Sequence, residues 1–300
     1  MILCCGEALI DMLPRETGAG ERAFAPYAGG SVFNTVIALG RLGIGTGFFS
    51  GLSTDLFGQI LTDTLAASHV TSDLAIRSDR PTTLAFVTLT DGQARYAFYD
   101  ENTAGRMLTP DDLPELPEDV TALFFGGISL PPDPCGLAYE TLMLREAARR
   151  VTMIDPNIRP SFITDEPGYR ARIGRMLAAA DIVKISDEDM DWLGTDAASL
   201  RAGGAKLVCV TEGAKGVTAH FAAGTLSVAA RRVEVVDTVG AGDTFNAGLL
   251  AGLERAGLLT KAALAGLTAE ALRPALELGN AAAAVTVSRA GANPPWEHEL

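Results

Sequence analysis

Short apolar runs alternate with amphipathic segments along most of the chain. The apolar runs are rich in Val, Ile, Phe and Cys, as strands buried on both faces usually are, and the segments between them have helical periodicity. The expected strands are Ile2–Leu9, Thr46–Gly51, Ala122–Gly127, Val151–Asp155, Asp181–Ile185 and Lys206–Thr211, and the expected helices are Val32–Leu42, Leu56–Ala67, Tyr139–Arg150 and Tyr169–Ala179. This order predicts an α/β fold in which helices flank a mostly parallel sheet. Ligands of such folds bind at the carboxyl ends of the strands.

One stretch departs from this alternation. Thr83–Thr90 and Ala94–Tyr99 flank Asp91-Gly92, which is the pattern of a β-hairpin. Residues 12–30 are rich in Gly and Pro and could pair with the hairpin or loop over the same face. These predicted β segments are too short to form a separate domain with its own hydrophobic core. We therefore expect one domain over residues 1–300 with a small β lid formed by about residues 12–30 and 82–104.

Composition and charge narrow the function further. The chain has 300 residues, of which 48% are hydrophobic and 20% charged, and its net charge of −13 disfavours general binding to nucleic acid or to anionic membranes. Four cysteines and three histidines are scattered without zinc-site or disulfide spacing. No apolar run reaches the roughly 18 residues of a membrane span, and the N-terminus lacks the features of a signal peptide. We expect a cytoplasmic protein.

The clearest chemical motif is Asp237–Gly248, with the sequence DTVGAGDTFNAG. A strand-like segment, Val233–Val236, precedes it and follows a second predicted hairpin, Gly216–Phe221 with Gly224–Ala229. The motif's glycines and the helix that follows provide backbone N–H groups for an anion, and Asp243 places a carboxylate beside them. A carboxylate beside a phosphoryl site can take the proton from an attacking hydroxyl. The alternative is that Asp243 only caps the helix.

A second motif lies near the N-terminus. Gly29 and Gly30 directly precede a helix whose first turn contains Asn34. The glycines let a hydroxylated ligand approach the backbone, and the Asn amide can donate to it and accept from it. Asp11, expected at the end of the first strand, adds a carboxylate at the edge of the same crevice. Alone, each feature is also compatible with an ordinary loop or a surface acid.

Together the two motifs resemble the ribokinase/PfkB family of carbohydrate kinases, and the resemblance covers essentially the whole chain. It implies the three-layer ribokinase-like fold, with ATP and Mg²⁺ as partners of a small-molecule sugar. It also implies that Asp243 is the catalytic base. Gly240, Ala241 and Gly242 would form the anion hole for the transferred phosphoryl group. Asp11, Gly29, Gly30 and Asn34 would contact sugar hydroxyls.

The resemblance further implies a nucleotide side of the site. The loop that begins at Thr211 and includes Gly213 and Gly216 matches the loop beneath the nucleotide, and Asn280 falls near the adenine position. Lys184–Asp189 lies where many members have Asn-x-x-Glu, and this chain departs from that pattern with Ser186 in the Asn place. We expect Lys184 and Ser186 on the nucleotide side.

Metal sites are implied in two places. Either Glu188 or Asp189 would organise Mg²⁺, although a solvated helix start is the alternative for this acidic cluster. A monovalent cation, K⁺ in the first instance, would contact Asp237 and the backbone near Val239 and Gly291.

The sequence features that indicate the sugar are less specific than those that indicate the reaction. The string Asp155–Pro160 is similar to that of fructokinases and 2-keto-3-deoxygluconate kinases, and it directs Arg159 at sugar or phosphoryl oxygens, unless Arg159 makes a structural ion pair. Tyr96 and Phe98 in the predicted lid look more like the sugar-pocket walls of fructokinases, or they belong to the hairpin core.

The sequence thus favours an ATP-dependent kinase of a ketohexose primary hydroxyl, with fructose first. Alternatives are a 2-keto-3-deoxygluconate kinase, another PfkB sugar or nucleoside kinase, and a non-catalytic sugar-binding regulator. A dehydrogenase is disfavoured because no G-x-G-x-x-G follows the first strand. We also expect a homodimer formed through exposed lid strand edges.

Overall fold

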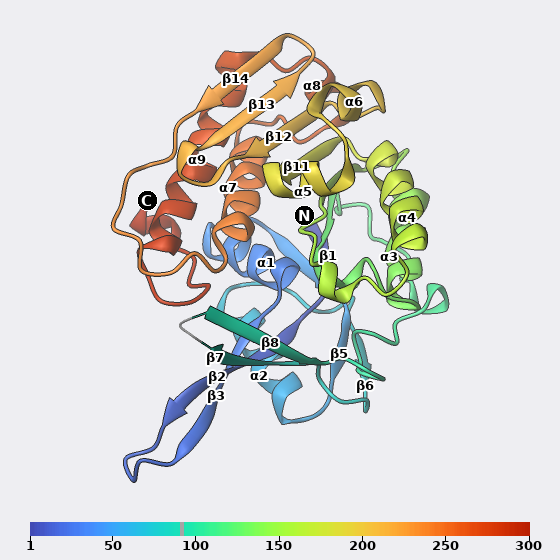
Figure 1. The fold of residues 1–300 in the computed structure, drawn as a ribbon. Helices are drawn as coiled ribbons and strands as arrows, with labels where there is room; N and C mark the ends of the chain where they lie inside the picture. The colour runs from blue at the N-terminus through green and yellow to red at the C-terminus, as the bar shows by residue number, and fades with distance from the viewer. Residues whose placement is uncertain (91–92) are drawn as a thin grey trace.

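A large sheet forms the centre of the molecule in a computed structural model that describes residues 1–90 and 93–300, with the side chains of residues 88–96 also outside the description. Its strand order is β14-β13-β12-β11-β10-β9-β1-β4 (Figure 1). The strands are β1 Ile2–Cys5, β4 Thr46–Phe49, β9 Ala122–Gly126, β10 Val151–Asp155, β11 Ile182–Ser186, β12 Leu207–Thr211, β13 Val217–Phe221 and β14 Gly224–Val228. Along the sheet, the neighbouring strands β4, β1, β9, β10, β11 and β12 pair in parallel. Strands β13 and β14 extend the sheet at the β12 edge with antiparallel pairing. The central strands are almost wholly buried, as their apolar sequences predict.

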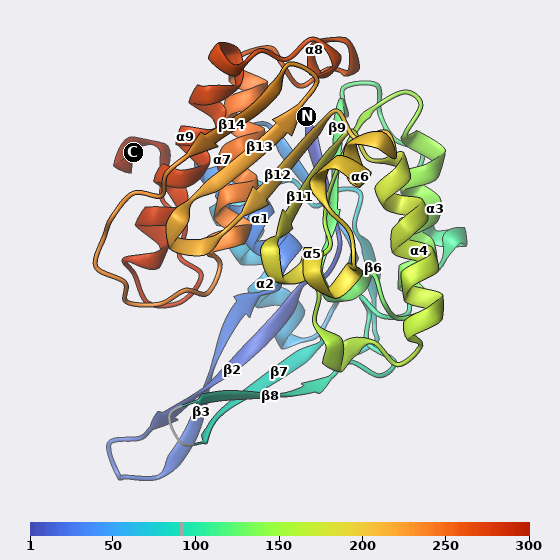
Figure 2. The same cartoon turned by 45° about the horizontal axis from the view of Figure 1, so that its top comes forward.

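Helices cover both faces of this sheet. The described helices are α1 Ser31–Arg41, α2 Leu56–Ala67, α3 Cys135–Glu146, α4 Glu166–Ala179, α5 Asp187–Leu193, α6 Ala197–Ala202, α7 Ala241–Arg255, α8 Lys261–Ala265 and α9 Ala269–Val287. Figure 2 shows α1, α7 and α9 on one face and α3 and α4 on the other. Two buried clusters correspond to these faces: one includes Phe33 of α1 and Leu249 of α7, and the other includes Tyr139 of α3 and Tyr169 of α4. This is the expected three-layer α/β architecture.

A smaller sheet projects from the body (Figure 1). Its order is β3-β2-β7-β8, with β2 Leu9–Glu16, β3 Arg22–Gly29, β7 Leu84–Thr90 and β8 Gln93–Tyr99. The predicted hairpin of β7 and β8 is confirmed. Residues 12–30, expected to pair with it or loop over the same face, form most of β2 and β3, and β2 pairs with β7. The predicted Asp91-Gly92 turn lies outside the described residues. A third, two-stranded sheet pairs β5 Gly51–Ser53 with β6 Ile76–Ser78.

The structure corrects two predictions of local structure. Val233–Val236 is not a strand: it is an exposed segment without regular secondary structure, attached by a hydrogen bond from the Val236 N–H to the Val287 carbonyl (2.8 Å). The predicted first strand Ile2–Leu9 is also wrong in extent, because β1 ends at Cys5 and Leu9 begins β2. Asp11 therefore belongs to the small sheet rather than to the end of the first strand. Across the described residues, no helix is both long and apolar enough to cross a membrane.

Candidate active site

A cleft of about 740 Å³ lies where the small sheet meets the carboxyl ends of the parallel strands. Its walls come from β2, β8, β10, β11 and the first turns of α1 and α7. The residues that line it are Glu7, Leu9, Asp11, Gly30, Ser31, Asn34, Phe98, Ile128, Asp155, Asn157, Arg159, Ser161, Phe162, Lys184 and Thr238–Asp243. The structure thus brings both sequence motifs, which lie about two hundred residues apart in the chain, into one site.

Asp243 lies at the base of this cleft, in the first turn of α7. The helix is capped by Gly240, whose left-handed backbone (φ 77°) suits glycine, so the interpretation of Asp243 as the helix cap is wrong. Its carboxylate instead accepts a hydrogen bond from Asn34 Nδ2 (2.9 Å). Burial raises the pKa of Asp243 to about 7, and the Asn34 hydrogen bond opposes this increase. A carboxyl group that titrates near neutral pH is suited to accept a proton from an alcohol.

The backbone of Gly240–Asp243 faces the cleft beside this carboxylate. The Ala241 N–H donates to the Thr238 carbonyl (3.3 Å), whereas the N–H groups of Gly242 and Asp243 have no acceptor among the described residues. A Cβ built on Gly242 would lie 3.2 Å from Lys184 Nζ. These two amides, the positive end of α7 and a lysine ammonium together favour an anion at this point.

A buried polar network supports the floor of the cleft. Asp155 Oδ2 accepts hydrogen bonds from Lys184 Nζ (2.9 Å) and from Asn246 Nδ2 (2.7 Å). Asp155 Oδ1 and Asn246 Oδ1 are buried without a hydrogen-bond partner among the described residues. Sequence reasoning did not assign Asp155 or Asn246 to the site. The signal was present, since Asp155 ends a buried strand and Asn246 lies one helical turn after Asp243.

Of the sugar-side candidates, Asp11, Gly30, Asn34 and Phe98 line the cleft, and Gly29 does not. Burial raises the pKa of Asp11, the third residue of β2, to about 6. Gly29 ends β3, and a Cβ there would lie 2.3 Å from Asp11 Oδ2, so only glycine leaves that carboxylate in place. Gly30 caps α1 with φ 108°. The Phe98 ring packs edge-on against Phe162 (4.3 Å between centroids), and both rings line the cleft. The side chain of Tyr96 lies outside the described part of the chain.

Arg159 also lines the cleft. Its Nη1 donates to the carbonyl of the neighbouring Ile158 (3.0 Å). Among the described residues no carboxylate lies within ion-pair distance of its guanidinium, so the structural ion-pair interpretation is not supported. The cation therefore remains available for an anionic ligand.

The nucleotide-side candidates are more dispersed. Lys184 faces the cleft, whereas Ser186 caps α5 by accepting from the Asp189 N–H (3.0 Å). Thr211 ends β12, and Gly213 and Gly216 follow it with positive φ angles of 53° and 106°. Space around Gly213 is open, while a Cβ on Gly216 would lie 2.2 Å from the Val228 carbonyl. Thr211, Gly213 and Gly216 do not line the cleft: Gly213 is exposed and Gly216 is buried.

Asn280 occupies a structural position in α9. Its Nδ2 donates to the carbonyls of Val228 (3.1 Å) and Ala229 (3.0 Å), so the amide ties the end of β14 to the helix.

The two metal-site expectations have different geometries. Asp189 is buried and its Oδ1 accepts from the Ile158 N–H (3.1 Å), and burial raises its pKa, whereas Glu188 is exposed. Asp237 accepts from the N–H groups of Val239 (3.0 Å) and Gly291 (2.9 Å), which brings the three predicted cation-site residues together. Within the described residues, no three His, Cys, Asp or Glu side chains form a metal-binding group.

Comparison with known proteins agrees with this geometry. A family model described as pfkB family carbohydrate kinase matches residues 1–299. The chain belongs to the PfkB family. A fructokinase of Rhizobium leguminosarum bv. trifolii is 58% identical over 279 residues, covering 91% of this PfkB chain and 86% of that protein. A probable fructokinase-4 of Arabidopsis thaliana is 33% identical over 318 residues, covering all of this chain and 95% of its own.

Solved structures agree with the family assignment. A fructokinase of Xylella fastidiosa with bound ATP superposes with a TM-score of 0.89 at 31% identity, covering 97% of this PfkB chain and 93% of that one. The ribokinase-like α/β fold expected from the sequence is confirmed, and the protein is a carbohydrate kinase.

Proposed function

We propose that this PfkB kinase is a fructokinase, transferring the γ-phosphoryl group of ATP to a primary hydroxyl of fructose. The observation that supports this most strongly is Asp243, a buried carboxylate at the head of α7 beside two backbone N–H groups that have no acceptor in the described part of the chain. The 58% identical relative is a fructokinase, which favours fructose over other sugars.

In the proposed reaction, the chain's own residues position the sugar and move one proton. Asp11, Asn34 and the backbone at Gly30 hold sugar hydroxyls at the mouth of the cleft, so that one primary hydroxyl faces Asp243. The Asp243 carboxylate accepts that proton as the hydroxyl oxygen attacks the γ-phosphorus and the bond to the ADP oxygen breaks. The amides of Gly242 and Asp243 stabilise the charge on the transferred group, and Lys184 and Arg159 contribute positive charge.

The donor set suits a magnesium–nucleotide complex. Mg²⁺ is held by one or two carboxylates together with phosphates and water. Asp189 provides a buried carboxylate, and Asp155 Oδ1, which has no hydrogen-bond partner among the described residues, provides a buried acceptor, whereas Glu188 is exposed. Bound there, Mg²⁺ would neutralise charge on the phosphates. The nucleotide base and ribose would lie over the Thr211–Gly216 loop, toward Asn280.

A monovalent cation would bind where the Asp237–Val239 segment meets Gly291. The Asp237 carboxylate accepts hydrogen bonds from the backbone N–H groups of Val239 and Gly291, which holds these two backbone segments beside a formal negative charge. Carboxylate and carbonyl oxygens are the donors that K⁺ binds.

The small sheet would act as a lid and as a dimer surface. Asp11 and Phe98 connect it to the cleft, so movement of the sheet changes access to the sugar. On its opposite face the rings of Phe24, Phe86 and Tyr99 form a row (5.0 and 5.5 Å between neighbouring centroids), with Phe24 42% and Tyr99 62% exposed. A second copy of the chain would cover this row and the adjoining strand edges. Light scattering should then give a dimer mass that falls to the monomer mass in Tyr99→Glu.

Turnover on a panel of acceptors tests the function. Fructose, glucose, ribose, 2-keto-3-deoxygluconate and adenosine should be compared with ATP and Mg²⁺. We expect the highest kcat/KM for fructose. A higher value for 2-keto-3-deoxygluconate would reassign the substrate, and stoichiometric sugar binding without turnover of any acceptor would favour a sugar-binding regulator.

A further inference from the structure

Glu7 is a buried carboxylate with no role in the mechanism above. It lies between β1, in the large sheet, and β2, in the small sheet, and it lines the cleft. One carboxylate oxygen, Oε1, accepts from the Ser31 N–H (2.9 Å), and the other, Oε2, accepts from the Ser129 hydroxyl (2.9 Å). The carboxylate therefore joins the start of α1 to the turn after β9.

Helix α1 depends on this contact because it has no side-chain cap of its own. Its N-cap residue is Gly30, which offers no side-chain acceptor for the first N–H groups of the helix. Glu7 provides that acceptor from a distant part of the chain. Gly30 also packs against it closely: a Cβ on Gly30 would lie 3.0 Å from the Glu7 carbonyl oxygen. The first turn of α1 is thereby fixed in both direction and position.

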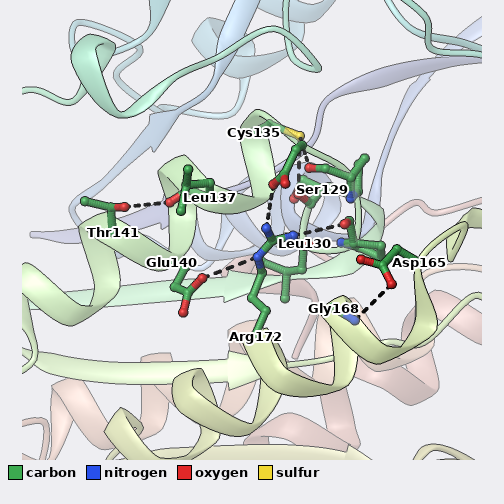
Figure 3. Close-up of polar contacts among 12 residues, drawn as sticks. Ser129, Leu130, Cys135, Leu137, Glu140, Thr141, Asp165, Gly168 and Arg172 are labelled. Atoms are coloured by element: carbon green, nitrogen blue, oxygen red, sulfur yellow. Dashed lines mark hydrogen bonds and ion pairs between the residues drawn. The ribbon is translucent and has the colours of Figure 1, made fainter.

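The other end of the contact is firmly held. Ser129 belongs to the 3₁₀ turn Gly127–Ser129, and its carbonyl accepts from Cys135 Sγ of α3 (3.3 Å). The next carbonyl, of Leu130, accepts from Arg172 Nη1 of α4 (3.0 Å) (Figure 3). Figure 3 shows both contacts converging on this turn from neighbouring helices. A Cβ on Gly127 would lie 2.1 Å from Glu7 Oε1, so glycine makes room for the carboxylate.

The turn that Glu7 fixes is the one that carries Asn34. The Asn34 N–H donates to the Gly30 carbonyl (2.8 Å), and its Nδ2 donates to Asp243. A shift of the first turn would move the amide that contacts both the base and the sugar. Small displacements of positioning groups reduce catalysis steeply.

We propose that Glu7 is a positioning residue: it anchors the first turn of α1 to the Ser129 turn and thereby sets where Asn34 meets Asp243 and the sugar. This inference rests on the proposed sugar kinase function. It predicts a defect on the sugar side of the site, since Gly240–Gly242 and Lys184 are held by other elements.

Replacement by alanine tests the anchor. Glu7→Ala should raise the fructose KM about tenfold or more and lower kcat, while the ATP KM stays within about twofold. Glu7→Gln should restore the fructose KM to within about threefold, because its oxygen still accepts from Ser31 and its amide can donate to the Ser129 hydroxyl.

The pH profile gives a second readout, which reports the charge of Glu7 near Asp243, while the split between the two KM values and the rescue by Glu7→Gln report its anchoring role. The charged groups facing Asp243 are Asp155 from β10, Lys184 from β11 and Glu7 from the β1–β2 connection, with Asn34 donating from α1. The negative charge of Glu7 raises the pKa of Asp243, so its removal in Glu7→Gln should move the acid limb of kcat/KM to lower pH.

Glu146 provides a matched control. It is also a buried glutamate, paired with Arg145, Arg149 and Arg150 at the end of α3, away from the cleft. Glu146→Gln should lower the melting temperature and leave both KM values and the acid limb unchanged.

Equal changes of both KM values in Glu7→Ala, or a wild-type fructose KM in that variant, would overturn the role of Glu7 while leaving an active wild-type enzyme. Wild-type protein inactive on every sugar of the panel would contradict the proposed function, and this inference with it.

Discussion

Asp243→Asn should remove activity and stabilise the protein, and the two effects have the same cause. Burial raises the pKa of the Asp243 carboxyl from 3.8 to about 7, so folding favours its protonated form. Asparagine keeps the shape and can accept the hydrogen bond from Asn34, but it cannot take a proton. We expect kcat to fall by about a thousandfold or more with a modest change in KM, since the base is used only in the transition state.

The stability effect should depend on pH in a defined direction. Well below pH 3.8 the carboxyl is protonated in both the folded and the unfolded protein, so its ionisation does not affect the free energy of unfolding. As the pH rises toward 7, the unfolded chain loses the proton first, and the wild type loses stability relative to the variant. The difference is complete above pH 7 and amounts to at most about 4 kcal/mol for a shift from 3.8 to about 7.

Thermal unfolding of both proteins at pH 5 and pH 8 measures this difference. The melting temperature of Asp243→Asn should exceed that of the wild type, and by more at pH 8 than at pH 5. A variant that is equally or less stable at pH 8 would refute the claim that a buried, destabilised carboxylate is held at this site. Near-normal turnover would refute its assignment as the base.

Three further predictions concern the sugar side of the site. In the wild type the hydrogen bond from Asn34 lowers the pKa of Asp243, so Asn34→Ala should raise that pKa and move the acid limb of kcat/KM to higher pH. An unmoved limb alongside a raised fructose KM would leave Asn34 as a sugar contact only. Gly29→Ala should raise the fructose KM about tenfold without changing the ATP KM, since the new Cβ meets Asp11 Oδ2; equal effects on both substrates would argue against a sugar-side position. ATP hydrolysis without sugar should be slow compared with phosphoryl transfer, and equal rates would contradict a lid that closes over bound sugar.

Much of the fold could be predicted because its strands are buried on both faces. The run Val151–Asp155 coincides with β10 and Leu56–Ala67 with α2, since apolar content and periodicity leave little choice there. Val233–Val236 shows where this reasoning fails. Its β-branched residues resemble a strand, but Val235 and Val236 are each 61% exposed and the chain crosses there from β14 to α7 without a partner strand.

The active site also has parts that could be predicted from the sequence and parts that could not. Gly240–Asp243 and Gly29–Asn34 could be found because both motifs are local in sequence. The contact of Asp155 with Lys184 and Asn246 could not, because it joins two strands and a helix that meet only in the folded chain. Glu7 was missed because Ile2–Leu9 looks like one strand, although a charged residue after Gly6 marks the point where the chain leaves the large sheet. Gly6 is required there, since a Cβ would lie 2.5 Å from Val32 Cγ2.

A crystal structure with fructose and a non-hydrolysable ATP analogue tests the central claim most directly. The account predicts that a primary hydroxyl oxygen of fructose lies within about 3 Å of the Asp243 carboxylate, between this carboxylate and the γ-phosphorus. It also predicts that the γ-phosphate contacts the backbone N–H groups of Gly242 and Asp243. Fructose bound with every hydroxyl out of reach of Asp243, or a γ-phosphate away from those amides, would contradict it.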